Sequence, residues 1–191
     1  KPMNFKLELN RLEDSSFKWD GGAWNHGVWL DGTWNSGEWL EGLWCGGAWY
    51  GGTWRAGTWL AGLWHAGLWI GGTWKHGLWR HGIWESGVWC GGEWCGGEWH
   101  SGAWAGGKWH RGSWDQGSWL GGQWLNGRWL GGTWKTGEWL GGTWVAGVWL
   151  SGSWIHGVWR DGEWKSGSWQ QGTWYNGEWL TGTWRSGEWH N

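Results

Sequence analysis

The stretch GGAWNHGVWLDGTWNSGEWL, residues 21–40, repeats a five-residue unit, G-x-W-x-x, four times. From Gly22 to Gly187 a glycine falls at every fifth residue, 34 in all, and a Trp stands two places after each. Five residues rotate an α-helix by about 500° and put successive repeats on opposite faces of a flat strand, so neither element keeps Trp on one side. The repeat therefore predicts a chain that turns once per unit.

The composition excludes several function classes. Of 191 residues, 35 are Trp and 44 are Gly, far above the usage of ordinary globular enzymes. The formal net charge of −2 is too near zero to indicate a nucleic-acid or membrane-surface partner. No apolar run approaches the roughly 20 residues that a membrane span needs. The three Cys do not form a disulfide framework.

The slot before each repeat Gly is typical of corners. It holds mostly Gly, Ser, Ala, His, Asn and Asp, which suit turns or tolerate positive φ. A short extended segment, G-x-W, followed by a corner winds into a β-solenoid when repeated, and its successive turns stack as parallel strands. We therefore expect an all-β solenoid.

The indoles are expected to point inward. Outward indoles would cover the surface with an aromatic sheet and would bury charged residues such as Lys75, Arg80 and Arg160. Each buried indole N–H then needs an acceptor, for which corner carbonyls or trapped water are suited. The predicted core positions in the first repeats are Trp24, Trp29, Trp34 and Trp39, with Gly22, Gly27, Gly32 and Gly37.

The variable slots predict how many units make one turn. Seven of the eight Thr between Gly and Trp share one phase of a ten-residue period, and so do eight of the nine Leu that follow Trp. An odd number of sides would scramble this pattern. In the N-terminal half a twenty-residue period also separates a polar column (Thr33, Thr53, Thr73) from an apolar one (Leu43, Leu63, Ile83). This favours four five-residue units per turn, and a rod roughly 40 Å long.

The repeat resembles that of the pentapeptide-repeat proteins, which reads A-(D/N)-L-x-x. On residues 17–191 the resemblance puts Gly22 and its successors in the small slot and Trp24 and its successors in the large central slot. It implies a right-handed quadrilateral β-helix with Trp and Gly inward. All three defining slots depart from the family pattern, so the shared feature is the period. MORN repeats also contain G-x-W-x-x-G, but in a longer, hairpin-based unit that the unbroken period argues against.

The chain divides into two parts. Residues 1–18 are predicted to form an N-terminal capping segment, in which Leu7, Leu12 and Phe17 occupy what would be Gly slots. Residues 19–191 are predicted to form a single solenoid with no obvious C-terminal cap.

Few side chains suggest chemistry. A twenty-residue turn would align Cys45 with His65 and Glu85 in one outward column, and Cys90 with His110 in another. Two or three ligands per column fall short of the four that a tetrahedral metal site needs, so we expect no metal site. No catalytic grouping and no cofactor motif stand out. A candidate interface is apolar, with Leu43, Leu63 and Ile83 on one face and Val28, Leu68 and Val88 on the next.

The sequence thus favours a non-catalytic structural or protein-interaction rod, part of a larger assembly such as a virion appendage or surface fibre. Its expected partner is a protein, either a second copy or an assembly partner, rather than a membrane, a nucleic acid or a small-molecule substrate. One alternative, which the resemblance implies, is a DNA-mimicking regulator of a topoisomerase, with Glu38, Glu98, Glu138 and Glu178 in one column. The other is a carbohydrate-binding module, which would need outward Trp.

Overall fold

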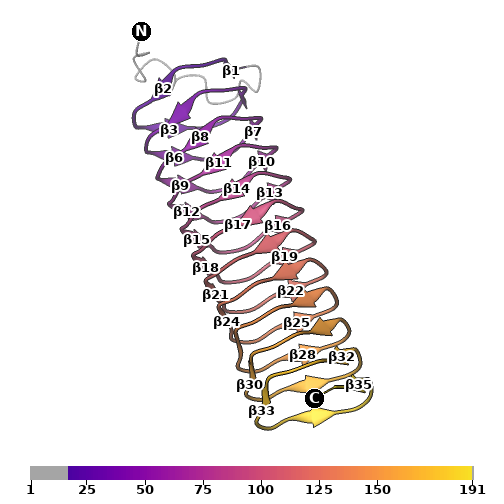
Figure 1. Cartoon of the computed structure of the whole chain (residues 1–191). Helices are drawn as coiled ribbons and strands as arrows, with labels where there is room; N and C mark the ends of the chain where they lie inside the picture. The colour runs from indigo at the N-terminus through magenta and orange to yellow at the C-terminus, as the bar shows by residue number, and fades with distance from the viewer. Residues whose placement is uncertain (1–16, 191) are drawn as a thin grey trace.

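The chain forms one straight-sided coil of stacked turns, with β1 (Lys18–Trp19) and β35 (Glu188–Trp189) at opposite ends of the rod (Figure 1). In the computed structural model, which describes residues 17–190, all regular structure is β and every strand has two residues, one outward residue followed by Trp. The five-residue period predicted from the sequence is confirmed, because a strand recurs at every fifth residue from Lys18 to Trp189. The all-β parallel solenoid is confirmed as well.

The strands form three parallel sheets, A, B and C, each running the length of the rod. Sheet A contains β1 (Lys18–Trp19), β4 (Thr33–Trp34), β7 (Ala48–Trp49), β10 (Leu63–Trp64), β13 (Leu78–Trp79), β16 (Glu93–Trp94), β19 (Lys108–Trp109), β22 (Gln123–Trp124), β25 (Glu138–Trp139), β28 (Ser153–Trp154), β31 (Ser168–Trp169) and β34 (Thr183–Trp184). Sheet B contains β2 (Ala23–Trp24), β5 (Glu38–Trp39), β8 (Thr53–Trp54), β11 (Leu68–Trp69), β14 (Ile83–Trp84), β17 (Glu98–Trp99), β20 (Ser113–Trp114), β23 (Arg128–Trp129), β26 (Thr143–Trp144), β29 (Val158–Trp159), β32 (Thr173–Trp174) and β35 (Glu188–Trp189). Sheet C contains β3 (Val28–Trp29), β6 (Leu43–Trp44), β9 (Thr58–Trp59), β12 (Thr73–Trp74), β15 (Val88–Trp89), β18 (Ala103–Trp104), β21 (Ser118–Trp119), β24 (Thr133–Trp134), β27 (Val148–Trp149), β30 (Glu163–Trp164) and β33 (Glu178–Trp179).

The coil is three-sided, so the prediction of four units per turn is wrong. Each strand pairs with the third strand after it, as in the register Trp64↔Trp79, and one turn therefore takes three of the five-residue units rather than four. With sheets of 11 or 12 strands at a spacing of about 4.8 Å, the rod is about 50 Å long. The right-handedness that the resemblance implies stays a prediction.

Indole packing gives a physical reason for three sides. Around one turn, Trp64 and Trp69 meet edge to face at 72°, while Trp64 and Trp79 in successive turns are nearly parallel at 4.7 Å. Three rings related by a third of a revolution make this angle with one another when the normal of each ring is tilted by about 43° from the rod axis. With that tilt, a rise of about 4.8 Å per turn leaves the planes of stacked rings about 3.5 Å apart, at van der Waals contact. Three tilted indoles thus fill each layer of the coil without overlap.

The ten-residue alternation of Thr and Leu is present in the sequence, but it does not reflect the number of sides of the coil. In a turn of three units, residues ten apart lie on different sheets. Neighbours along one sheet are 15 residues apart and therefore come from opposite phases of the alternation. In sheet A, for example, Thr33 lies next to Ala48, and in sheet C Thr73 lies next to Val88. The character of the outward residues therefore alternates from turn to turn along each face and repeats every two turns, so no described face carries a uniform column of Thr or of Leu.

The core consists of Trp, as predicted. From Trp34 to Trp174 every repeat indole is 0% exposed, and the described residues include no buried polar or charged residue. The last turn is uncovered: Trp179 and Trp184 are half-buried and Trp189 is 45% exposed. The inward direction of the tryptophans is thereby confirmed.

From Gly32 on, the repeat glycines that the structure describes at the corners are required for two reasons, conformation and space. Gly62 has a φ of +123°, and a Cβ there would lie 2.5 Å from the carbonyl oxygen of Gly47, one turn earlier. The repeat Gly has a positive φ, and no described non-glycine residue has one. The residue before the repeat Gly therefore does not adopt the left-handed conformation that we expected it to tolerate. The turn thus depends on Gly for both conformation and space.

The predicted capping segment, residues 1–18, lies outside the described residues except for Phe17 and Lys18. Phe17 takes the position of a repeat Gly one turn before Gly32, and its ring packs 5.0 Å from that of Trp29. Its carbonyl accepts the first rung hydrogen bond, from the amide of Thr33. Whether residues 1–16 complete a cap stays a prediction.

Candidate functional site

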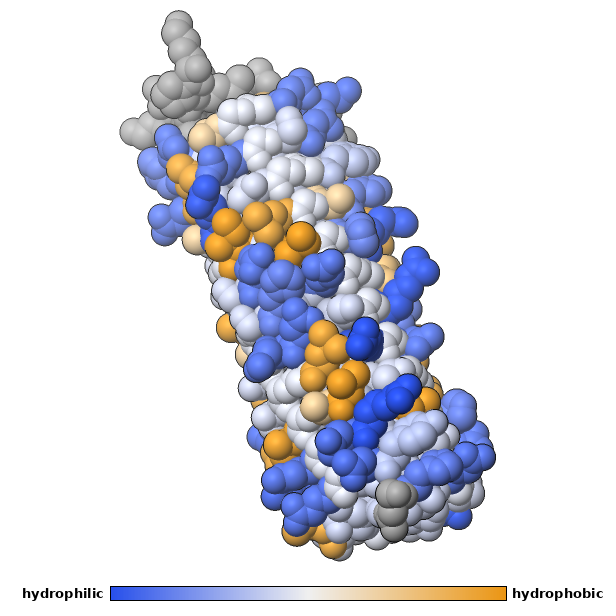
Figure 2. Space-filling model, viewed as in Figure 1, coloured by the Kyte–Doolittle hydropathy of each residue, from blue (hydrophilic) through white to orange (hydrophobic). Residues whose placement is uncertain are grey.

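Outward side chains alternate in character along the rod. Figure 2 shows apolar patches separated by polar ones on the viewed face, with no apolar surface running from end to end of that face. The densest set of interacting charged and imidazole groups lies near the middle, over β14 to β20, where Glu and His side chains of successive turns meet. This mid-rod polar belt is the candidate functional site.

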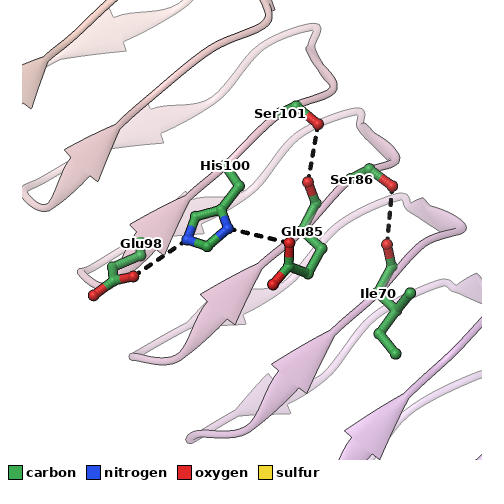
Figure 3. A network of polar contacts seen from close by, with 6 residues as sticks. All are labelled: Ile70, Glu85, Ser86, Glu98, His100 and Ser101. Atoms are coloured by element: carbon green, nitrogen blue, oxygen red, sulfur yellow. Dashed lines mark hydrogen bonds and ion pairs between the residues drawn. The ribbon is translucent and has the colours of Figure 1, made fainter.

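His100 links two carboxylates in this belt. Its Nδ1 lies 3.1 Å from Oε2 of Glu85, one turn earlier, and its Nε2 lies 3.2 Å from Oε2 of Glu98 on the same turn (Figure 3). Burial lowers the pKa of His100, but hydrogen bonds with Glu98 and Glu85 and the negative charges of Glu85 and Asp115 outweigh burial and raise the pKa above its ordinary value of 6.5. A protonated imidazole would bridge both carboxylates.

Serines at the corners above and below fix the backbone around this link. Ser101 Oγ donates to the carbonyl of Glu85 at 3.0 Å, and Ser86 Oγ donates to the carbonyl of Ile70 at 2.9 Å (Figure 3). The same contact recurs at Ser186, which donates to the carbonyl of Gln170. At these corners a Ser before the repeat Gly thus ties the corner to the previous turn.

A second His–Glu pair lies on the neighbouring face. His110 Nε2 lies 3.2 Å from Oε2 of Glu93. Beside them in the ladder is Cys95, whose pKa is raised, chiefly by burial and then by Glu93, against the lowering effect of Arg80 and Arg111. Both arginines therefore lie close enough to influence one thiol.

A hollow opens at the corner beside this pair. The corner column runs His81, Gly96, Arg111, and these three residues lie in the lining of a cavity of about 440 Å³. Its lining consists of Arg80, His81, Gly96, Gly97, Glu98, Arg111, Gly112 and Ser113. Sequence reasoning missed this cluster, because Arg80, Gly96 and Arg111 are brought together only when the turn has three units.

The predicted Cys–His columns are not formed. Residues four units apart lie on different sheets, so the structure separates Cys45 from His65 and Cys90 from His110. It places Cys95 beside His110 instead, since both residues follow strands that pair in sheet A. Within residues 17–190 no group of three or more His, Cys, Asp or Glu is arranged to hold a metal, and the three Cys are free thiols.

The candidate apolar interface is divided among three faces. Val28 and Leu43 are ladder neighbours in sheet C, and Leu68 and Ile83 are neighbours in sheet B. Leu63 lies in sheet A, and Val88 lies in sheet C three turns beyond Leu43. The single patch expected from twenty-residue columns is thus replaced by smaller pairs, and their role as an interface stays a prediction.

The acidic column expected for a DNA mimic is also dispersed. Glu38 and Glu98 lie in sheet B, Glu138 in sheet A and Glu178 in sheet C. Neighbouring positions carry opposite charge in several places: Arg55 pairs with Glu38, and Lys165 lies 2.8 Å from Glu163. No described face presents the continuous negative row that such a mimic needs.

The indole N–H groups find the acceptors predicted for them in part. Seven donate to the carbonyl of the corner residue 17 positions later, as Trp79 does to Gly96 at 3.1 Å. The others are Trp29, Trp99, Trp149, Trp159, Trp164 and Trp169. Most remaining indole N–H groups in the described core are buried without a partner. The repeated geometry shows that the corner carbonyl is the natural acceptor.

The structure itself defines the architectural class, a three-sided β-solenoid repeat protein. No family model matches the sequence, and no curated protein matches it. Among solved structures, a chain described as an acetyltransferase from Desulfovibrio desulfuricans G20 is similar at 2% identity and a TM-score of 0.18, over 71% of this chain and 66%, just under two thirds, of that chain. The polysialic acid O-acetyltransferase OatWY is similar at 6% identity and a TM-score of 0.13, over 85% of this chain and 79% of that chain. Likeness this slight carries no functional argument.

The described residues form no helix, and hence none long and apolar enough to cross a bilayer.

Proposed function

We propose that this chain is a non-catalytic structural rod that holds a fixed length and presents its outward side chains to protein partners in a larger assembly. The observation that carries the proposal is the unbroken indole core, 0% exposed from Trp34 to Trp174. Every turn makes the same stacked and edge-to-face contacts, so no turn offers a natural hinge. A rod of this kind resists bending because any bend must separate stacked rings.

The division between inward and outward positions supports the same role. The inward slots hold only Trp and Gly, whereas the outward slots hold charged, polar and apolar residues in turn. Outward residues are therefore free to vary without disturbing the core. Along sheet C they include a column of Leu with Lys between them, in which Leu120 is 42% exposed and Leu180 is 51% exposed. We propose this Leu–Lys column, of Leu120, Lys135, Leu150, Lys165 and Leu180, as a lateral contact with a second copy or an assembly partner.

Only one feature of the pentapeptide-repeat resemblance, the five-residue period, supports this proposal. The regulatory role known for some of those proteins needs an acidic face, and here the acidic residues are distributed over three sheets. Carbohydrate binding through outward indoles has no support in the described core, where the rings are buried. A scaffold role is the one that the continuous core favours.

Spin-label distances test the rod. In a variant whose three Cys are replaced by Ser, labels at Asn35→Cys and Arg185→Cys would lie ten turns apart on one column, about 48 Å. A matched pair at Asn35→Cys and Leu125→Cys would lie six turns apart, about 29 Å. We expect a narrow distribution of label-to-label distances for each pair, with mean distances in the ratio of ten turns to six. Broad distributions, or mean distances shorter than these, would overturn the rigid-rod proposal.

Sedimentation tests the assembly. We expect the mean mass to rise with protein concentration, and we expect Leu120→Glu, with Leu180→Glu, to abolish the rise. A matched change on sheet A, Leu140→Glu, should leave the rise of mean mass with concentration unchanged. A mass equal to the monomer at every concentration would remove self-association from the proposal.

A further inference from the structure

The hollow at Gly96 has the shape of a small binding site. It lies at the corner between the face of sheet A and that of sheet B, where Gly96 stands between His81 and Arg111 in the corner column. Gly96 has no positive φ, and a Cβ placed on it would lie 3.6 Å from the carbonyl oxygen of Arg80 and 3.7 Å from Nε of Arg111. The backbone at Gly96 therefore accepts a Cβ, and a larger side chain there would enter the space that the Arg111 side chain borders.

The charge around the hollow is arranged to leave two guanidinium groups free. The nearest carboxylates are engaged by histidines, Glu98 by His100 and Glu93 by His110. Within residues 17–190, Arg80 and Arg111 have no ion pair and no side-chain hydrogen bond. Figure 3 shows Glu98 turned toward His100 on the sheet B face. Two unpaired cations and an imidazole thus share one cavity with a carboxylate that already has a partner.

This cluster matches one kind of ligand. A guanidinium presents a planar fork of donors that fits two oxygens of a phosphate or carboxylate, and two such forks suit a dianion. Ser113 adds a hydroxyl donor to the lining. A cavity of 440 Å³ holds on the order of fifteen water volumes, more than a bare phosphate fills. The room left over suits a small organic group.

We propose that the hollow at Gly96 binds a small phosphate monoester, with Arg80 and Arg111 on the phosphate oxygens, His81 and Ser113 as further donors, and the organic group over the glycines. Glu98 limits affinity by its own negative charge. Binding of this kind adds a ligand-responsive position to the middle of an otherwise uniform rod.

The test uses the whole chain with phenyl phosphate and inorganic phosphate as probes, in a buffer free of other oxyanions. We expect phenyl phosphate to shift the Nε–Hε NMR signals of Arg80 and Arg111 selectively, and to bind more tightly than inorganic phosphate by calorimetry. Arg111→Gln should weaken binding by about tenfold or more, since it removes a charge-assisted contact. Glu98→Gln should strengthen it.

Two matched pairs separate the site from general charge attraction. Gly96→Leu should fill the hollow and abolish binding, whereas Gly51→Leu, on the same corner column and with a Cβ 3.6 Å from the Asn35 carbonyl oxygen, should not. Arg80→Gln should weaken binding, whereas Arg185→Gln, seven turns along the same column, should not. Unchanged affinity in Gly96→Leu, shifts spread over all arginines, or equal affinity for the two probes would overturn the assignment. These outcomes are independent of rod length and assembly.

Discussion

Trp64 and Trp79 lie face to face one turn apart, with ring centroids 4.7 Å apart and planes at 6° to each other. The same contact recurs at every turn on all three sides, as at Trp69 and Trp84 and at Trp74 and Trp89. Each described indole inside the rod therefore has a stacked neighbour above and below it, and edge-to-face neighbours within the layers. Stability is distributed along the chain rather than concentrated at one core.

Removing one interior indole should open a cavity that its neighbours cannot close. For Trp94→Ala we expect a loss of about 3–5 kcal/mol in the free energy of unfolding, because both the transfer term and the cavity term apply. Urea unfolding measures the loss, and hydrogen exchange should place it in the adjoining turns. Trp189→Ala, at a ring that is 45% exposed, is the control and should cost far less. Equal losses would contradict a closed interior stack.

Two consecutive glycines should respond oppositely to the same substitution. A Cβ at Gly107, where φ is +107°, would lie 2.4 Å from the carbonyl oxygen of Gly92, whereas one at Gly106 would lie 3.7 Å from that of Cys90. Gly107→Ala should therefore cost about 2–5 kcal/mol through backbone strain and overlap. Gly106→Ala should be neutral or stabilising by up to about 1 kcal/mol. Thermal unfolding of the two variants gives the comparison, and similar melting points would refute this account of the corner.

One substitution should distinguish a three-sided coil from a four-sided one. His110→Cys places a thiol three repeat units after Cys95 and four repeat units after Cys90. Ladder neighbours lie about 4.8 Å apart, within the Cα separation that a disulfide accepts. Mild oxidation followed by peptide mapping should therefore give a bond between positions 95 and 110. A bond between positions 90 and 110 would restore the four-sided geometry.

The pKa values of two histidines should be shifted in opposite directions from the ordinary value. The pKa of His100 is raised, because Glu98 and Glu85 outweigh its burial, and that of His65 is lowered, by burial and then by Arg80. The contribution of His100 to stability is thus fully present below its unfolded pKa of about 6.5 and is lost as the pH rises through its folded pKa. The charged form of His65 is disfavoured, so its effect is a loss of stability as the pH falls through about 6.5.

Imidazole NMR titration measures both shifts. We expect His100 to titrate above 6.5 and His65 below it, and Glu98→Gln to lower the pKa of His100. His100→Gln should destabilise the protein more below pH ~6 than above pH ~8. A pH-independent effect of this variant would show that the imidazole acts only by packing.

The sequence determines the inside of this rod more fully than its outside. Trp at one slot and Gly at another leave one arrangement in which charges stay hydrated, so the solenoid and the inward indoles were predictable from the repeat. The corner carbonyl was one of two acceptors expected for the indole N–H groups, and it serves for seven of them, Trp79 among these. The number of sides was not predictable, because it depends on the tilt at which indoles pack. The twenty-residue spacing of Thr33, Thr53 and Thr73 reflects how outward residues alternate along the chain, and it does not measure the length of one turn.

The error in turn length carried over to every outward grouping. Cys90 with His110, and Leu43 with Leu63, are neighbours only if the turn has four repeat units. The pairs that the structure forms, Glu85 with His100 and Cys95 with His110, follow from three units per turn. Local composition favoured the wrong count, since polar and apolar residues of the N-terminal half separate into columns under a twenty-residue turn and mix under the fifteen-residue turn that forms.

Because every five-residue unit is equivalent inside the coil, each added or lost unit changes the length of the rod by a third of a revolution. Insertion or loss of one G-x-W-x-x unit would leave the indole stacks continuous and would rotate all later outward residues by a third of a revolution relative to earlier ones. Directly after Gly96, for example, such a change would set His100 above a residue other than Glu85 and would move Arg111 away from the hollow at Gly96. The interior tolerates such slippage, so it is the pattern on the outside that fixes how many units this rod must keep.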